Sequence, residues 1–333
     1  MAGYKEIKGF QVQTRTEDPS PTEVQTGDFY YNSSTGQYKT INSGGAPIGT
    51  WSSGAAVNTA RTHSGGAGNS KDNALFFGGS QPPNTTSALT EKYDGSSWTE
   101  VSNLNTARIY LSGTGSSTAA ITASGGSAIP QVESWDGSSW TEIAELNTPR
   151  GGAAMVGTTT SALAISGYSG GYSPQVEQWN GSAWTEISDV NYGHYGGSAA
   201  GASVTSALVF GGENPPRGGN EQKDTELWDG SSWSEQNNMS NTRSWTWSAG
   251  TATSALVAGG QPNTVNTEVW DGSSWAEVNN LATPRSYTGG KCGTSTNTLY
   301  ASGSTNPPTL SNRTTATEEW TAADFQIKTV TTS

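Results

Sequence analysis

A phrase of seventeen residues recurs almost unchanged along this chain, and it limits the possible folds more than any other feature. KYDGSSWTEVSNLNTAR ends at Arg108, and SWDGSSWTEIAELNTPR ends at Arg150. The second aromatic residue of the phrase returns every 42 to 50 residues, at Trp51, Trp98, Trp140, Trp184, Trp233 and Trp275, with Phe325 in the corresponding place at the end. A repeat of this length is a supersecondary unit that buries its core by stacking against its neighbours.

Each repeat is predicted to contain four β-strands. Its apolar runs are short, alternate with polar residues and are bounded by glycine, as in SALVFGG and PQVEQWNGSAWTEI, and helical periodicity is absent. The Asp-Gly pairs supply the positive φ that a tight hairpin requires. Four strands in about 45 residues, repeated around an axis, are typical of a β-propeller blade. We expect an all-β, six-bladed propeller whose repeated aromatic residues pack between neighbouring blades.

The order of marker residues within a repeat resembles the kelch repeat. An arginine is followed by a pair of small residues ending in glycine, then by Tyr or Trp, and five residues later by the second aromatic residue. The resemblance covers residues 51 to about 325, and it implies that strand A follows the arginine, strand B ends at the glycine pair, and strands C and D hold the two aromatic residues. The DGSS and NGSA turns between strands C and D are tighter than most kelch turns.

The ends of the chain are expected to meet in the last blade. Trp51 stands in the register of strand D but has no strands A to C before it, so it can supply the outermost strand next to Trp320. Phe325 competes for the same place, and we favour Trp51 because its spacing to Arg61 is the normal one. We divide the chain into an extension at residues 1–49 with a β-hairpin around residues 33–36, a propeller at residues 50–327, and a tail at residues 328–333.

Charge and cysteine content exclude several classes of function. The net charge of −12 argues against nucleic acid as a partner, since binding to phosphates needs a basic surface. Cys292 is the one cysteine, which excludes an internal disulfide, and its neighbours offer no metal-ligand spacing. The N-terminus has no apolar signal region, and no stretch approaches the ~20 apolar residues of a membrane span, so we expect neither Sec export nor membrane insertion.

The candidate ligand-binding residues lie on the face that carries the B–C loops. These loops vary most in length, with 9 to 17 residues between the last glycine of strand B and the aromatic residue of strand C. Variable polar loops on a rigid scaffold are a usual place for binding. In kelch adaptor domains, residues at the repeated arginine position help to line the ligand-binding mouth. By this resemblance the candidates for gripping a carboxylate or sulfate are Arg61, Arg108, Arg150, His194, Arg243 and Arg285, with Arg217 of the fourth loop.

A structural role for the same arginines is the alternative. Each repeat carries a glutamate two residues before its first aromatic residue, at Glu91, Glu133, Glu177, Glu226, Glu268 and Glu318. Such residues can form salt bridges between blades. The sequence leaves both interpretations open.

No constellation of residues predicts catalysis, so we expect no enzyme activity, no cofactor and no bound metal. The two histidines, His63 and His194, and Cys292 fall in separate ordinary repeat positions, unlike the copper ligands of galactose oxidase, which also has a kelch propeller. Most carboxylates belong to the repeat. The exceptions, Glu213, Glu221 and Asp224, are expected to be solvated.

The N-terminal segment suggests where the protein works. GDFYYNSSTGQYKTI is similar to segments of tail-fibre and other virion proteins of tailed, particularly marine, bacteriophages, and the phrases WDGSSW and LNTAR fit the same group. We therefore expect a virion surface protein, extracellular after host lysis and homo-oligomeric. It would attach to other virion proteins through residues 1–49 and would bind a host-surface glycan or protein. The alternatives are an intracellular kelch-type adaptor that binds an acidic peptide and a carbohydrate-active enzyme.

Overall fold

The computed structural model divides the chain into two compact units. Unit 1 comprises residues 1–48 and 323–333, and unit 2 comprises residues 49–322. The structure describes residues 12–16, 29–42, 49–126, 128–218, 220–288, 290–306, 312–322 and 326–329. Among these residues no helix is long and apolar enough to cross a membrane.

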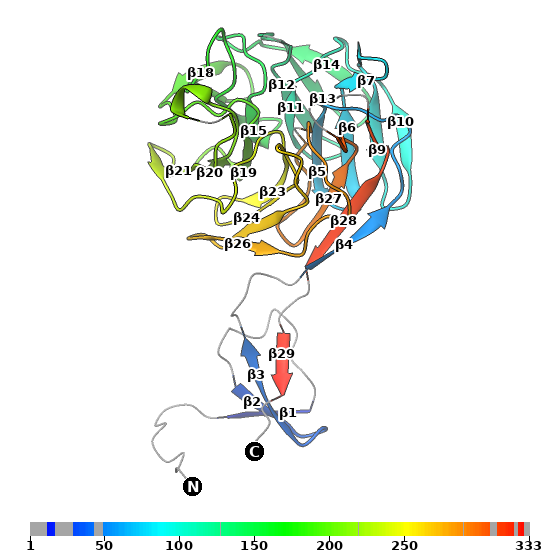
Figure 1. Ribbon diagram of the computed structural model, residues 1–333, viewed down its shortest axis with the longest axis vertical. Helices are drawn as coiled ribbons and strands as arrows, with labels where there is room; N and C mark the ends of the chain where they lie inside the picture. Colours follow the sequence, from blue (N-terminus) through cyan, green and yellow to red (C-terminus); the bar gives the residue numbers. More distant parts are fainter. Residues whose placement is uncertain are drawn as a thin grey trace. The chain divides into compact units, whose positions relative to one another are not determined.

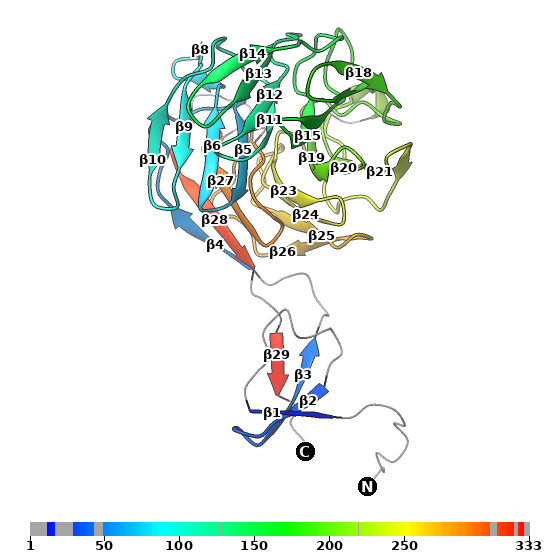
Figure 2. The same cartoon turned by 180° about the vertical axis from the view of Figure 1, so that it is seen from behind.

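Unit 2 is built from small antiparallel sheets arranged around a common axis (Figures 1 and 2). Five sheets have four strands each, and in each of them consecutive strands pair from the axis outwards. Their strands are β5(Gly65–Ser70), β6(Asn73–Phe77), β9(Thr90–Tyr93) and β10(Trp98–Val101); β11(Ser112–Gly115), β12(Ala120–Ala123), β13(Val132–Trp135) and β14(Trp140–Ile143); β15(Ala154–Thr158), β16(Ser161–Ile165), β17(Val176–Trp179) and β18(Trp184–Ile187); β19(Ser198–Ser203), β20(Ser206–Phe210), β21(Thr225–Trp228) and β22(Trp233–Glu235); and β23(Trp247–Thr251), β24(Ser254–Ala258), β25(Thr267–Trp270) and β26(Trp275–Val278). The predicted all-β propeller is confirmed. A short hairpin of β7(Ser80–Gln81) and β8(Thr85–Thr86) and the 3₁₀ turn η1(Pro215–Arg217) lie in B–C loops.

The last sheet of unit 2 joins the two ends of the unit. It contains β27(Asn297–Ala301), β28(Thr317–Ala322) and β4(Gly49–Gly54), and Trp51 pairs directly with Trp320. Trp51 therefore closes this sheet, as favoured from the sequence, whereas Phe325 lies outside the described residues.

The innermost position of the last sheet departs from the repeat. Ser286, Lys291 and Thr294 form isolated bridges there, and the structure assigns no strand to the described residues between 286 and 294, among which Gly289 is not described. The indole of Trp247 lies so close to Gly290 that a Cβ there would be 2.0 Å from it. This close approach occupies the space where a regular strand would carry side chains.

Aromatic residues fill the space between the sheets, as the sequence predicted. In each sheet the aromatic residue of strand C packs against that of strand D, with ring centroids 4.9–5.5 Å apart. Trp140 of the second sheet also contacts Phe77 of the first, at 5.0 Å, and its indole N–H donates to Thr90 Oγ1 at 3.0 Å. Burying an aromatic side chain of this size stabilises the fold by about 2–3 kcal/mol. The indole N–H of each of the other strand D tryptophans likewise donates to the preceding blade or to the connection from it, so these residues join consecutive blades.

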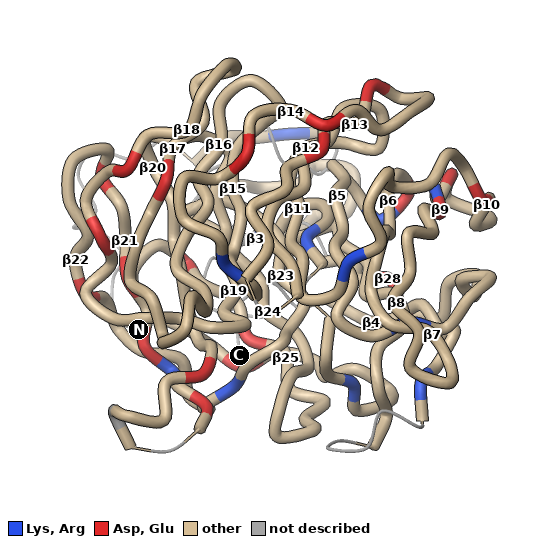
Figure 3. Tube along the Cα trace, turned by 90° about the horizontal axis from the view of Figure 1, so that it is seen from above, with Lys and Arg blue, Asp and Glu red and all other residues tan. Residues whose placement is uncertain are grey.

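The outermost strands carry exposed glutamates. Figure 3 marks acidic positions on β10 and β14 in red, and the same third position recurs through the five complete sheets as Glu100, Glu142, Glu186, Glu235 and Glu277. These strands are sheet edges with unpaired backbone groups. Charged side chains on such edges oppose pairing with another chain.

Unit 1 is a four-stranded sheet with the order β1(Gln13–Arg15), β2(Phe29–Asn32), β3(Gln37–Asn42) and β29(Gln326–Thr329). Strands β2 and β3 form the predicted antiparallel hairpin, and Ser34 N and Thr35 N both donate to Asn32 Oδ1 in its turn.

The C-terminal boundary of the propeller differs from the predicted one. Residues 323–333 belong to unit 1, because β29 pairs with β3, so the propeller ends at residue 322 and not at 327.

Candidate functional site

Five of the arginines that were candidates for ligand binding are completely buried. Each side chain is 0% exposed and forms an ion pair with the glutamate of its own repeat. The pairs are Arg61–Glu91, Arg108–Glu133, Arg150–Glu177, Arg243–Glu268 and Arg285–Glu318. Burial lowers the pKa of Arg61 to about 10, against the attraction of Glu91 that raises it, so the guanidinium stays charged at neutral pH.

Arg108 shows how each pair joins two consecutive blades. Its Nη2 donates to Glu133 Oε1 at 2.8 Å, and its Nη1 donates to the carbonyls of Gln131 and Ser124 in the same sheet. Its backbone is bonded to the preceding blade, because its N–H donates to Ser87 O and its carbonyl accepts from Gly79 N. The side chain and backbone of one residue thus hold adjacent sheets in register.

The prediction that these arginines contact a ligand is therefore wrong, because their side chains are buried in ion pairs. A fully buried guanidinium whose terminal N–H groups are directed to a buried carboxylate and to carbonyls presents no exposed face to an external anion. His194 takes the equivalent position in the fourth repeat, with Nε2 3.1 Å from Glu226 Oε1 and Nδ1 2.6 Å from Gly211 O. Arg217 ends η1, and its side chain lies outside the described residues.

The residue two places after each arginine, or after His194, lies at the propeller axis. All six have a left-handed backbone, with φ between 53° and 62°. They are His63, Tyr110, Gly152, Gly196, Trp245 and Tyr287. Backbone hydrogen bonds of 2.5–3.4 Å link each of these positions to the next. The N–H group of each residue donates to the carbonyl of the equivalent residue in the preceding repeat, except that Thr288 N takes the place of Tyr287 N as the donor to Trp245 O. His63 N completes the circle by donating to Tyr287 O. The ring is therefore closed at its axis.

Aromatic side chains converge at this end of the axis and form what we call the tyrosine cluster. It consists of His63, Tyr110, Tyr168, Tyr172, Tyr195, Trp245 and Tyr287, whose neighbouring ring centroids lie 4.4–6.3 Å apart. Tyr168 and Tyr172 belong to the third B–C loop, and the other five residues lie in the connections from strand D of one repeat to strand A of the next. The cluster thus lies on the B–C face, and its five tyrosines are partly exposed.

Two glycines make room for the cluster. A Cβ on Gly152 would lie 2.6 Å from the Tyr195 ring, and one on Gly196 would lie 2.4 Å from the Trp245 indole. The repeats that lack an aromatic residue at this position therefore accept the rings of their neighbours.

Glu213 brings a carboxylate to the edge of the cluster. It lies in the fourth B–C loop, and its Oε1 accepts from Trp245 Nε1 at 2.6 Å and from Ser244 Oγ at 3.3 Å. It is half-buried, and this burial raises the pKa of its carboxyl, with a smaller contribution from Glu221. The expectation that Glu213 is a solvated surface residue is therefore wrong.

The sequence carries a signal for this cluster that the predicted binding residues did not include. At the position two residues after the arginine, or after His194, four copies carry a large ring and two carry glycine. The arginine itself is the same in five of the six copies. Within a repeat protein, positions that differ between copies are free of the shared structural role.

The closed ring of blades defines the chain as a β-propeller protein. Comparison with solved structures agrees, since the chain is similar to the structure titled "Structure of YjhT", with a TM-score of 0.65 and 13% sequence identity, over 83% of this chain and 99% of that one. At this identity the likeness shows the fold alone. No protein-family model matches the chain, and no curated protein matches it in sequence.

Proposed function

We propose that this protein is a non-enzymatic attachment protein of a tailed-bacteriophage virion, which binds a host-surface glycan through the tyrosine cluster. The observation that carries the proposal is the group of partly exposed tyrosine rings beside the Glu213 carboxylate. Sugar rings present an apolar C–H face and a rim of hydroxyls. Tyrosine rings can pack against the C–H face, and phenol and carboxylate oxygens can form hydrogen bonds with the hydroxyls.

Unit 1 supports the proposed place in the virion. The chain passes from unit 1 into unit 2 at Gly49 and leaves at Ala322, and these two residues are paired neighbours in the last sheet. One separate unit therefore carries both ends of the chain. We assign to it the contact with other virion proteins and homo-oligomerisation, and we assign release of the virion to host lysis.

The first test is a glycan array probed with the full chain, followed by calorimetry on the glycans that bind. Replacing Tyr172 with Ala is expected to weaken binding by about tenfold or more, since an exposed ring at a binding surface contributes on the order of 1–2 kcal/mol. Tyr38→Ala is the matched control, because Tyr38 is 46% exposed in β3 of unit 1 and is expected to leave glycan binding unchanged. Equal affinity of the Tyr172 variant and the parent would refute the assignment of the site.

The second test addresses the virion. Mass spectrometry of purified particles is expected to detect this chain, and its absence would exclude a role as a virion component. If the protein binds glycan but is missing from the particle, the proposed glycan site stands and the proposed location in the virion is refuted.

A carbohydrate-active enzyme is the second candidate, favoured by one observation. Burial raises the pKa of the Glu213 carboxyl beside the tyrosine rings, and a general acid needs a carboxyl whose pKa is raised. Product analysis after long incubation with the bound glycan, for the parent and for Glu213→Gln, decides between binding and turnover. The kelch-type adaptor has less support, because the arginines that would bind an acidic peptide are buried.

A further inference from the structure

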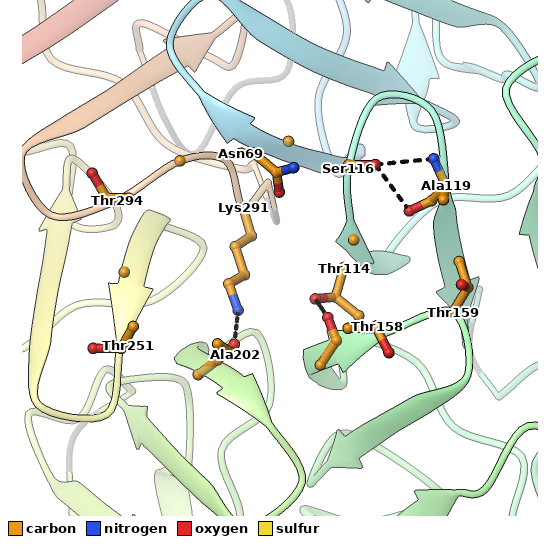
Figure 4. Close-up of a pocket in the computed structure, with 16 residues that line it drawn as sticks. Asn69, Thr114, Ser116, Ala119, Thr158, Thr159, Ala202, Thr251, Lys291 and Thr294 are labelled. Atoms are coloured by element: carbon orange, nitrogen blue, oxygen red, sulfur yellow. Dashed lines mark hydrogen bonds between the residues drawn. The ribbon is translucent and has the colours of Figure 1, made fainter.

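The axis of the propeller opens into a cavity at the end opposite the tyrosine cluster. Its volume is about 520 Å³, and the A–B turns of all six repeats line it (Figure 4). Each repeat contributes one glycine to the lining, and these are Gly68, Gly115, Gly157, Gly201, Gly250 and Gly293. The A–B turns and the B–C loops lie at opposite ends of the strands, so this cavity is distinct from the proposed glycan site.

Trp247 separates the two ends of the axis. It stands two residues after Trp245 of the cluster and three before Gly250 of the cavity. Its rings approach both Gly66 and Gly290, where added Cβ atoms would lie 3.1 Å and 2.0 Å away. The indole thus fills the space between the tyrosine cluster and the cavity.

The lining of the cavity is nearly uncharged and mixes apolar surface with hydroxyl groups. It includes the side chains of Thr114, Ser116, Thr158, Thr251 and Thr294, and Lys291 is the one charged side chain among its described residues. No carboxylate lines the cavity among the residues that the structure describes, although acidic residues outnumber basic ones 28 to 16 in the whole chain. The charge of Lys291 therefore has no opposite charge in the described lining of the cavity.

Lys291 extends into the cavity and forms one hydrogen bond, from Nζ to Gly201 O at 2.8 Å (Figure 4). No ion pair involves it among the described residues. An ammonium group can donate three hydrogen bonds, so two N–H groups remain for a ligand. Its surroundings lower its pKa to about 7 through desolvation, because no described carboxylate opposes this effect.

The repeat shows that the fold does not need this lysine. Lys291 stands two residues before the glycine of its A–B turn. The residues at that place in the other repeats are Gly66, Gly113, Met155, Ala199 and Ser248. Five copies thus form the same turn without a charge.

We propose that this cavity binds a small hydroxylated monocarboxylate, with its carboxylate against Lys291 Nζ and its hydroxyls against the threonines. The volume lies within the range of small-molecule sites, roughly 300–1,000 Å³. One ammonium balances one carboxylate, whereas a doubly charged phosphate would stay partly uncompensated in a cavity without a second cation. The hydroxyls of Thr158, Thr251 and Thr294 can both donate to and accept from a polyol, whereas Thr114 Oγ1 already donates to Gly157 O at 2.8 Å.

The experiment measures binding of D-gluconate to the full-length protein by calorimetry at pH 6.0, with neutral D-glucose and inorganic phosphate as the comparison probes. Gluconate is expected to bind at least about tenfold more tightly than glucose and more tightly than phosphate, as expected for a charge-assisted hydrogen bond. Lys291→Met is expected to remove this preference, and Thr185→Ala on the exposed face of β18 is the control.

A second measurement does not depend on the Lys291→Met variant folding. In the parent protein at pH 8, gluconate binding is expected to take up a proton, seen as a dependence of the binding heat on the ionisation enthalpy of the buffer. The described lining residues include no second titratable side chain, and the adjacent Cys292 thiol is directed to Ser70 O with its pKa raised to about 12 by burial. Equal binding of gluconate and glucose, tighter binding of phosphate, no proton uptake, or no binding of gluconate at about 10 mM would each overturn the proposal.

Discussion

At the scale of single residues, the buried ion pairs explain why one arginine recurs in the repeat. A charge removed from water is costly unless it is paired and its remaining donors are satisfied. Glu133 accepts from Arg108 and also from the backbone N–H groups of Asn105 and Thr106, which lie in the connection from the preceding blade. Each pair therefore anchors an irregular connection at the point where two blades meet.

Replacing Arg108 with Ala is expected to lower the free energy of unfolding by about 3–5 kcal/mol, because Glu133 would remain buried without its partner. Urea unfolding followed by tryptophan fluorescence measures this change. Thr185→Ala, on an exposed strand position, is expected to stay within about 0.5 kcal/mol of the parent. If the Arg108 variant lost glycan binding but kept its stability, Arg108 would be a ligand contact and its structural role would be refuted.

His63 makes the stability of the propeller depend on pH. Burial among Tyr110, Trp245 and Tyr287 lowers its pKa from 6.5 to about 3, with a smaller contribution from Arg313. Between these two values the unfolded chain binds the proton and the folded chain does not, so this contribution to stability is complete above pH 6.5 and is lost as the pH falls.

The expected slope from this residue is about 1.4 kcal/mol per pH unit between pH 6 and 4. Urea unfolding of the parent and of His63→Phe over this range measures it, since the phenyl ring keeps the aromatic packing and removes the titration. Tyr110 has the same left-handed backbone as His63, so this backbone conformation is compatible with the phenylalanine introduced at position 63. Parallel pH curves for the two proteins would show that His63 does not titrate as described.

At the scale of elements, the strands are alike and the connections differ. The C–D turns repeat one geometry, in which Asp136 Oδ1 accepts from Ser138 N and Ser139 N at 2.8 Å while Gly137 adopts a φ of 99°. The connections after strand D carry either a large ring or a glycine at the axis. Both proposed binding sites use residues that differ between the repeats, whereas the residues common to all repeats stabilise the fold.

Gly196→Ala tests whether the cluster depends on the room that glycine leaves. It adds a methyl group 2.4 Å from the Trp245 indole, in a residue with a φ of 62°. The expected loss of stability is about 2–4 kcal/mol, from backbone strain and overpacking together. The Trp245 environment should change in near-ultraviolet circular dichroism.

Gly170→Ala is the matched control for this substitution. Gly170 has a φ of 77° and no atom within 4 Å of an added Cβ, so it reports the backbone strain alone, about 1 kcal/mol. Equal losses for the two variants would show that the clash with Trp245 is absent.

At the scale of the whole molecule, closure depends on a strand from the opposite end of the propeller unit. Strand β4 pairs with β28 over six residues, and Tyr93 OH donates to Glu319 Oε1 at 2.6 Å across the join between the last and first blades. Arg313 adds a second link, from the last B–C loop to Ser80 and Asn84 of the first blade.

Two shortened chains test this closure, both ending at residue 322. One begins at residue 49 and keeps β4, and it is expected to unfold in a single transition close to that of the full chain. The other begins at residue 55, leaves the last sheet with β27 and β28, and is expected to lose its cooperative transition, because a two-stranded piece is marginal by itself. Thermal unfolding followed by circular dichroism compares them, and identical curves would show that β4 is dispensable.

Much of the architecture could be predicted from the sequence because it follows from local chemistry that is repeated. Alternating apolar residues specify the strands, Asp-Gly pairs specify the turns, and the spacing of Trp51 from Arg61 specifies the strand that closes the last sheet. The pairing of Arg with Glu was one of two open alternatives, since spacing alone does not tell whether a side chain faces inward or outward. Strand β29 was missed, because four residues after the last repeat carry no sign of pairing with β3.

The chain by itself therefore determined the repeated sheets and the order in which they follow one another. Only the tertiary structure decided which side chains meet at the axis. The tyrosine cluster draws residues from all six repeats and from two kinds of connection, and the Lys291 cavity draws from six turns. Such convergence depends on the radius of the closed ring and on the burial of the arginines, and both arise from packing between residues far apart in the sequence.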